Sequence, residues 1–156
     1  MIKLVRIDDR LIHGQVVVGW GQPLNVGFIV LVDDAVRASP WEQDLYRMGV
    51  PPEIEVIFAS ISEAAARLEV WDQDPRAGIV LTPDVATLAS LTEHCHRVRR
   101  VNIGGIHHRA GRTERLRFVY LSDTEVDQLR RLAAQGIEVT AQDVPTARAV
   151  PLTEFT

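Results

Sequence analysis

The stretch GFIVLV, residues 27–32, indicates the fold class of this 156-residue chain. It is a continuous apolar run rather than a strict alternation of apolar and polar residues, which is typical of a strand buried on both faces. Further short strand segments, most of them of the same kind, are expected at residues 2–7, 54–58, 78–81, 100–103, 117–120 and 137–140. The apolar run is far shorter than the roughly 18–20 residues that a membrane span needs.

Helix signals lie between these strand segments. Ser60 precedes ISEAAARLEV and has Glu63 at the spacing of a capping box, and Ser122 precedes DTEVDQLRRLAAQG with Glu125 at the same spacing. Gly136 is expected to end the last of these helices, because glycine readily adopts the backbone conformation that follows a helix.

A further helix is expected to open at Pro83 and Asp84, since proline is tolerated in a helix's first turn. The alternation of strand and helix predicts an α/β fold, an open and mostly parallel sheet of about seven strands with helices on both faces. Residues 103–118 carry no helix signal and are interpreted as an irregular crossover or a hairpin, which leaves room for one antiparallel strand near the C-terminal end. We expect residues 1–156 to form a single domain, a length that buries about two thirds of the unfolded chain's surface.

The composition limits the classes of protein to consider. Hydrophobic residues make up 46% of the chain, charged residues 24%, and the formal net charge is −4, which is ordinary for a globular protein and argues against general nucleic-acid binding. Cys95 is the only cysteine, which excludes an internal disulfide and fits a reducing compartment. The start, MIKLVRIDD, lacks the apolar core of a signal peptide. We therefore expect a cytoplasmic protein that does not insert into a membrane.

The candidate functional residues lie in RIDDRLIHGQVV, residues 6–17. Ligands of open α/β sheets bind beyond the carboxyl ends of the strands, and the loop at residues 8–13 follows such an end. GQVVVGW is expected to form a helix with Gly14 near its start, where unpaired N–H groups and a partial positive charge suit a phosphate group.

His13 in that place is suited to accept a phosphoryl group, because the helix start disfavours the charged ring and later stabilises the phosphoryl dianion. The planar guanidinium of Arg10 can grip phosphate oxygens in pairs, which lysine does less well. Asp8 or Asp9 can accept a hydrogen bond from the other ring nitrogen or hold Arg10 in place. The same residues also fit a capped turn with solvated charges, and spacing alone favours that simpler interpretation.

RIDDRLIHGQV resembles the signature of the IIB subunits of the mannose/fructose/sorbose family of the bacterial phosphoenolpyruvate-dependent sugar phosphotransferase system (PTS). VNIGG at 101–105, RAGR at 109–112 and LSDTEVDQLRRLAAQGIEV at 121–139 resemble further segments of that family in the same order. The resemblance implies that His13 is the phosphoryl carrier, through Nδ1, that Arg10 stabilises the phosphoryl group, and that Asp8 orients the site.

The resemblance also implies the partners. A IIB component accepts a phosphoryl group from a IIA protein or domain and passes it to a sugar bound by membrane IIC and IID subunits, so that it is a phosphohistidine–sugar phosphotransferase component, peripherally associated with a transporter complex. Transfer between two histidines rests on positioning and electrostatics, so we expect no cofactor. One alternative is a regulatory phosphocarrier or interaction module of the same fold without a transporter downstream. Another is a nucleotide-binding enzyme, for which no complete Gly-rich loop is found.

The sequence decides neither the sugar nor the oligomeric state, and it is compatible with a homo-oligomer. Thr82, Gly104 and Gly105 follow other strands and are expected to border the His13 loop. The residues expected to surround the phosphoryl group itself are Leu11, Ile12, Gly14 and Gln15.

Residues 94–117 hold seven Arg, four His and one Glu, a formal charge of +6, while the rest of the chain carries −10. This asymmetry either steers an acidic partner, such as a phosphorylated IIA protein, or marks a solvated basic edge. RNA binding is not favoured, because aromatic residues are not interleaved with the basic ones. The histidines of EHCHR and IHHR lack zinc-ligand spacing, so no metal site is expected. Trp20 and Trp41 are expected to pack rather than to dock a partner.

Overall fold

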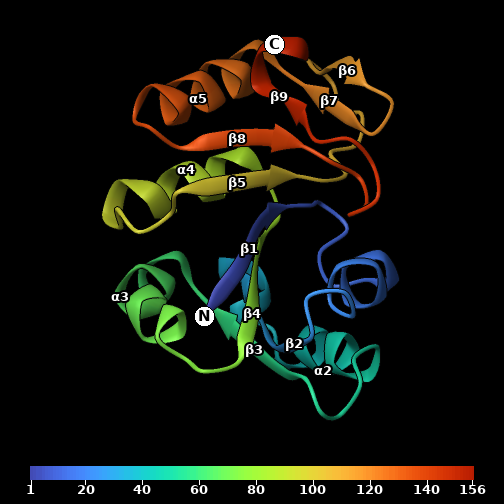
Figure 1. The fold of residues 1–156 in the computed structure, drawn as a ribbon, viewed down its shortest axis with the longest axis vertical. Coiled ribbons are helices and arrows are strands. Elements are labelled where there is room, and N and C mark those ends of the chain that lie inside the picture. The colour runs from blue at the N-terminus through green and yellow to red at the C-terminus, as the bar shows by residue number, and fades with distance from the viewer.

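A computed structural model describes all residues from 1 to 156 and contains a seven-stranded sheet and a separate hairpin (Figure 1). The strand order in the sheet is β3-β2-β4-β1-β5-β8-β9, and every strand except β9 runs parallel to its neighbours. The predicted α/β class and mostly parallel sheet are therefore confirmed. The strands of the sheet are β1 (Ile2–Ile7), β2 (Val26–Val32), β3 (Glu55–Ala59), β4 (Ala77–Thr82), β5 (Arg100–Ile103), β8 (Glu138–Ala141) and β9 (Val150–Pro151).

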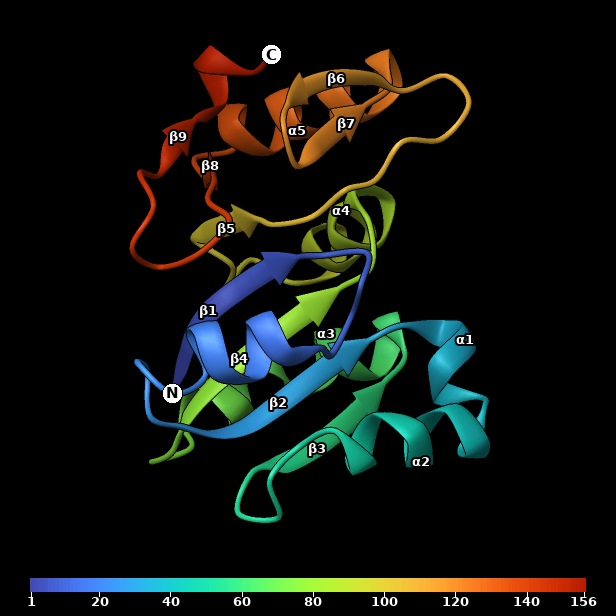
Figure 2. The same cartoon turned by 90° about the vertical axis from the view of Figure 1, so that its right-hand side faces the viewer.

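Helices cover both faces of the sheet, and each face has its own hydrophobic core. Figure 2 shows η1 on one side of the strands, with α3 and α4 on the other. In β2 the side chains of Ile29 and Leu31 join one core and those of Phe28, Val30 and Val32 join the other, and all are fully buried. The helices are η1 (Gln15–Trp20), a short π-helix, α1 (Asp34–Arg37) and α2 (Pro40–Met48) on one face, α3 (Ile61–Asp72), α4 (Val85–His94) and α5 (Asp123–Ala134) on the other, and a 3₁₀ turn, η2 (Leu152–Glu154), near the C-terminus.

The predicted helix ends of α3 and α5 are confirmed. In α3 the Ser60 side chain accepts a hydrogen bond from the backbone of Glu63, whose carboxylate accepts one from the backbone N–H of Ser60. Ser122 and Glu125 form the same capping box in α5. Gly136 follows α5 with a φ of 91°, a left-handed conformation that glycine adopts without a steric penalty.

Four expectations about particular elements were wrong or incomplete. Pro83 lies outside α4, because the side chain of Asp84 caps the helix after it. The strand expected at 117–120 is instead β7 (Val119–Leu121), which forms a hairpin with β6 (Thr113–Leu116) outside the main sheet. The antiparallel strand expected near the C-terminal end is present as β9, but its position was not predicted. Trp20 is buried as expected, but Trp41 is 65% exposed on α2.

The candidate loop, residues 8–13, lies where the segments that connect the strands change from one face of the sheet to the other. From β1 the chain passes through η1 to β2 on one face of the sheet, whereas from β5 it passes through α5 to β8 on the other. β1 and β5 are neighbours, so the connections change face between them, which is the position where ligands bind to open α/β sheets. No helix of the structure has the length and apolar character needed to cross a bilayer.

Candidate functional site: a buried ion pair beneath His13

The loop after β1 is fastened to both neighbouring strands. The backbone N–H of Asp8 donates to the carbonyl of Thr82 at the end of β4 (3.0 Å), and that of Asp9 donates to the carbonyl of Gly105 just beyond β5 (2.9 Å). Leu11 then turns the chain with a φ of 62°, a conformation that is uncommon for a residue with a side chain. The loop therefore has a defined shape before it reaches His13.

Asp8 is the centre of the site and is fully buried. Arg10 donates from Nε to Oδ1 and from Nη2 to Oδ2, both at 3.0 Å, and Arg6 donates from Nε to Oδ2 at 3.3 Å. Burial raises the pKa of the Asp8 carboxyl, but the contacts with His13, Arg10 and Arg6 outweigh it and hold that pKa far below its usual range. Asp8 is therefore a carboxylate at neutral pH.

The His13 ring is held on both sides. Its Nε2 is buried 3.3 Å from Oδ2 of Asp8, too poorly aligned for a hydrogen bond, and no other group reaches it. Its Nδ1 accepts a hydrogen bond from the backbone N–H of Gln15, at 3.3 Å, where η1 begins. Since Nδ1 accepts a hydrogen bond and Nε2 lies beside a carboxylate, these surroundings favour the neutral tautomer with its proton on Nε2 and its lone pair on Nδ1.

Arg6 supports the site from beneath. It is fully buried in the middle of the sheet, and its guanidinium donates to Oδ1 of Asn102 and to the backbone carbonyls of Gln142 (2.8 Å) and Asp143 (3.0 Å). The guanidinium carbon also lies 5.1 Å from the ring centre of Trp20, a distance suited to a cation–π contact. Arg6 thus joins β1 to β5 and to the segment after β8.

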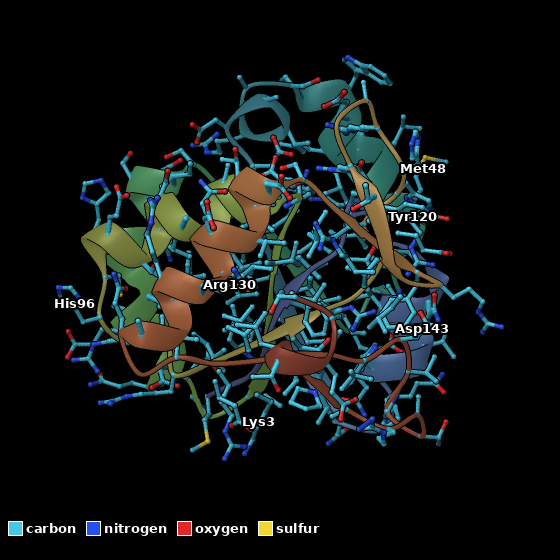
Figure 3. The ribbon with its side chains drawn as sticks, turned by 90° about the horizontal axis from the view of Figure 1, so that it is seen from above. Lys3, Met48, His96, Tyr120, Arg130 and Asp143 are labelled. Carbon is cyan, nitrogen blue, oxygen red and sulfur yellow. The ribbon has the colours of Figure 1, made fainter.

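Gln15 and Asp143 close the network on the side of η1. The Gln15 side chain accepts a hydrogen bond from Nη1 of Arg10 (2.6 Å) and donates one to Oδ1 of Asp143 (3.0 Å). The indole N–H of Trp20 donates to the backbone carbonyl of Asp143 (3.2 Å). In Figure 3 Asp143 lies beside η1, on the opposite side of the molecule from His96. The segment after β8 is therefore part of the site.

Two glycines allow the chain after β5 to pass against these charges. A Cβ atom on Gly104 would lie 2.6 Å from Oδ2 of Asp8 and closer still to the guanidinium of Arg6. A Cβ atom on Gly105 would meet only Arg10, at 3.0 Å from Nε. Both glycines therefore lie against the loop that follows β1.

The structure brings together most of the predicted residues, with two differences. Thr82 is fully buried at the base of the loop and Ile12 is buried in the core under η1, so neither faces the surface of the site. The paired donors of Arg10, expected to face a phosphate, are engaged by Asp8 in this structure.

Sequence reasoning missed three residues of this network: Arg6, Asn102 and Asp143. The one available signal was the position of Arg6, a charged residue between Val5 and Ile7 in the strand segment that leads directly into Asp8. A residue of this kind in a central strand must find a buried counter-charge.

The basic segment 94–117 does not form one surface patch. Residues 97–100 lie at the amino end of β5, whereas residues 107–117 lie beyond its carboxyl end, in the loop and the hairpin. His107 joins the site directly, because its backbone N–H and its Nδ1 contact the two carboxylate oxygens of Asp9 at 2.7 and 2.6 Å. The charge asymmetry is thus divided between the two ends of the sheet.

Comparison with known proteins assigns this arrangement to a class of phosphoryl-transfer proteins, the IIB components of phosphotransferase systems. The family model described as PTS system sorbose subfamily IIB component matches residues 2–156. The chain therefore belongs to the sorbose subfamily of PTS IIB components.

Individual relatives agree with this family. The N-acetylgalactosamine-specific phosphotransferase enzyme IIB component 1 of Escherichia coli (strain K12) is 32% identical over 154 residues, which cover 92% of this chain and 91% of that protein. The PTS system mannose-specific EIIAB component of the same strain is also 32% identical, but the match covers 94% of this chain and 45% of that protein. This chain thus spans less than half the length of that relative.

The fold agrees with a solved structure of the family. The IIBSor domain of the sorbose permease from Klebsiella pneumoniae superposes with a TM-score of 0.89 at 26% sequence identity, over 99% of this chain and 95% of that domain. The seven-stranded sheet with helices on both faces is therefore the architecture of the family.

Proposed function

We propose that His13 is a phosphoryl carrier, which accepts a phosphoryl group on Nδ1 from a phosphohistidine of a IIA protein or domain. The group then passes to a sugar bound by membrane IIC and IID subunits. The observation that carries this proposal is the fixed ring of His13, with Nε2 against the Asp8 carboxylate and Nδ1 at the start of η1. Membership of the IIB family supports it.

The first transfer needs only one bond to form and one to break. The lone pair on Nδ1 of His13 attacks the phosphorus atom, the bond between phosphorus and the donor nitrogen breaks, and its electron pair returns to the donor ring. The His13 ring keeps its proton on Nε2 and becomes a cation, which the Asp8 carboxylate stabilises across 3.3 Å. In the second transfer a sugar hydroxyl oxygen takes the phosphoryl group, its proton leaves to solvent, and the bonding pair returns to Nδ1.

Hydrogen-bond donors around the ring suit the phosphoryl oxygens. The backbone N–H groups of Ile12, His13 and Gly14 donate no hydrogen bond within the chain, and the N–H of Gln15 points at Nδ1 itself. Donors fixed before the reaction stabilise developing charge without reorganising. Arg10, whose side chain is one third exposed, adds positive charge at the same edge while Asp8 fixes its orientation.

This carrier role needs no nucleotide, metal or other cofactor, since donor and acceptor are both side chains or sugar hydroxyls. It fits a protein that works in the cytoplasm at the surface of a membrane transporter. A regulatory phosphocarrier without a transporter uses the same first transfer and lacks the second.

The test of the proposal is phosphoryl transfer from labelled phosphoenolpyruvate through the general phosphotransferase proteins and a cognate IIA protein. We expect acid-labile label on His13 and none in the His13→Ala variant. The matched control is His96→Ala, because His96 is exposed and lies on the opposite side of the molecule from Asp143 of the site (Figure 3). Transfer to the His13→Ala variant at the wild-type rate would refute the proposal.

The second transfer is tested with membranes that contain the IIC and IID subunits. Formation of sugar phosphate from the labelled protein is the expected result. Label that stays on His13 in the presence of competent membranes and sugar would favour the regulatory alternative.

A further inference from the structure

A cavity of about 600 Å³ opens between β1 and β5, away from His13. β1 pairs with β4 over its whole length, from Ile2 to Ile7, but it pairs with β5 only through Arg6 and Ile7. The two strands therefore diverge toward their amino ends, and the backbone of β1 faces open space there. Central strands of a doubly covered sheet are normally paired on both edges.

The rim of this cavity carries unpaired positive charge. Lys3 is exposed although it belongs to a central strand, and Arg99 is exposed just before β5. Neither side chain makes an ion pair or a hydrogen bond with another part of the chain. Two exposed cations that line the same cavity attract an anion.

Two other arginines at the rim are paired with carboxylates, and the carboxylate of Asp72 has no cationic partner. Arg100 pairs with Glu138 at 3.0 Å, and the carboxylate of Asp72 accepts the backbone N–H of Ile2 at 3.2 Å. Arg97 pairs with Glu69 at 2.8 Å. The side-chain charges of the cavity without a partner of opposite sign are therefore those of Lys3, Arg99 and Asp72, and the two cations outweigh the one carboxylate.

Part of the cavity wall consists of residues that also support the proposed phosphoryl site from inside the sheet. Trp20, Asn102 and Gln142 line the cavity, and the same three residues contact the guanidinium of Arg6. Half of the lining residues are hydrophobic, among them Leu4 and Val5 of β1. The cavity thus offers an apolar interior below a cationic rim.

We propose that this cavity is a second ligand site, which binds a small organic anion with its charged group between Lys3 and Arg99 and its apolar part against Trp20. The chemical class is a phosphate ester or carboxylate with an apolar body, because neither an inorganic ion nor a neutral apolar molecule would use both the rim and the interior. The site is separate from His13 and does not depend on the carrier role.

The experiment is an NMR titration of the ¹⁵N-labelled full chain with phenyl phosphate, in parallel with phenol and inorganic phosphate. The indole N–H of Trp20 is the reporter, since Trp20 lines the cavity and this N–H has a fixed partner, the backbone carbonyl of Asp143. We expect saturable shifts of this signal with phenyl phosphate and much weaker binding of the other two compounds. Lys3→Gln and Arg99→Gln should each weaken binding about tenfold, through loss of a charge-assisted contact.

Two control variants distinguish binding in this cavity from general attraction to surface arginines and from binding at His13. Arg117→Gln removes an exposed arginine that has no ion pair and lies in the hairpin region, and His13→Ala removes the proposed carrier. Both variants should bind phenyl phosphate like the wild type. Equal binding of phenol, equal weakening by Arg117→Gln, loss of binding in His13→Ala or the absence of a saturable shift would each overturn the proposal.

Discussion

Substitution of Gly104 by alanine tests the buried charges most directly. The added Cβ atom would lie 2.6 Å from Oδ2 of Asp8 and closer still to the guanidinium of Arg6. Both side chains are fully buried, so neither can move into solvent to make room. The methyl group must therefore separate the two charges or displace β5 from β1.

The expected loss of stability is large. Separation of a buried ion pair leaves an uncompensated charge, which costs about 3–5 kcal/mol. In a domain of this size each kcal/mol lowers the melting temperature by about 2–4 °C, so we expect Gly104→Ala to melt about 6–20 °C below the wild type. Calorimetry and urea unfolding measure the two quantities independently.

Gly105→Ala is the matched control. Its Cβ atom would meet only Arg10, at 3.0 Å from Nε, and the partly exposed Arg10 side chain can shift outward. We expect this variant to lose less than about 1 kcal/mol, because the crowded neighbour is a side chain that can move rather than a fixed buried charge. If Gly104→Ala melted with the wild type, the reasoning about the buried pair would be wrong. If both variants lost the same stability, the cause would be the lost backbone flexibility of the glycine and not the contacts of the added Cβ atom.

Three further predictions concern the loop, the pH dependence and a helix end. Arg10→Lys should slow phosphoryl acceptance about tenfold or more in the labelling assay, because lysine cannot reproduce the paired hydrogen bonds to Asp8. An unchanged rate would show that Arg10 has no part in the mechanism. The free energy of unfolding should fall as the pH drops below about 4, because the pKa of Asp8 is lowered in the folded state and the unfolded chain takes up the proton first. Urea titrations at several pH values should show a smaller fall in the Asp8→Asn variant than in the wild type. Ser122→Ala should lower the unfolding free energy by about 0.5–2 kcal/mol through loss of the cap on α5, and a melting temperature equal to that of the wild type would contradict this.

The sequence predicted correctly those strands and helix ends that depend only on residues a few positions away in the chain. The apolar run of β2 and the capping residues Ser60 and Ser122 depend on neighbours a few residues away, so the sequence displays their cause directly. β9 contains only two residues, one of them proline, and it exists because β8 offers a free edge. Such a strand has no pattern of its own to recognise.

The residues of the site also fall into two groups, those that are close in sequence and those that only the assembled sheet brings together. His13, Arg10 and Asp8 lie within six residues of one another, so their association follows from chain continuity. The contact of Arg6 with Asp143 joins residues 137 positions apart and depends on the order of the strands. The register that brings β1, β5 and β8 side by side is a property of the whole sheet, and no short segment reveals it.

The support beneath His13 also has a kinetic consequence. In the role proposed for His13, the same ring is presented to two different partners in every cycle. A loop that became ordered only on contact would lose about 1–2 kcal/mol of backbone entropy per residue at each encounter. Here the ordering is complete before any partner arrives, because Arg6 and Asp8 hold the loop from inside the sheet. The outer surface of the loop is then free to differ between relatives, so that a change of partner need not disturb the chemistry.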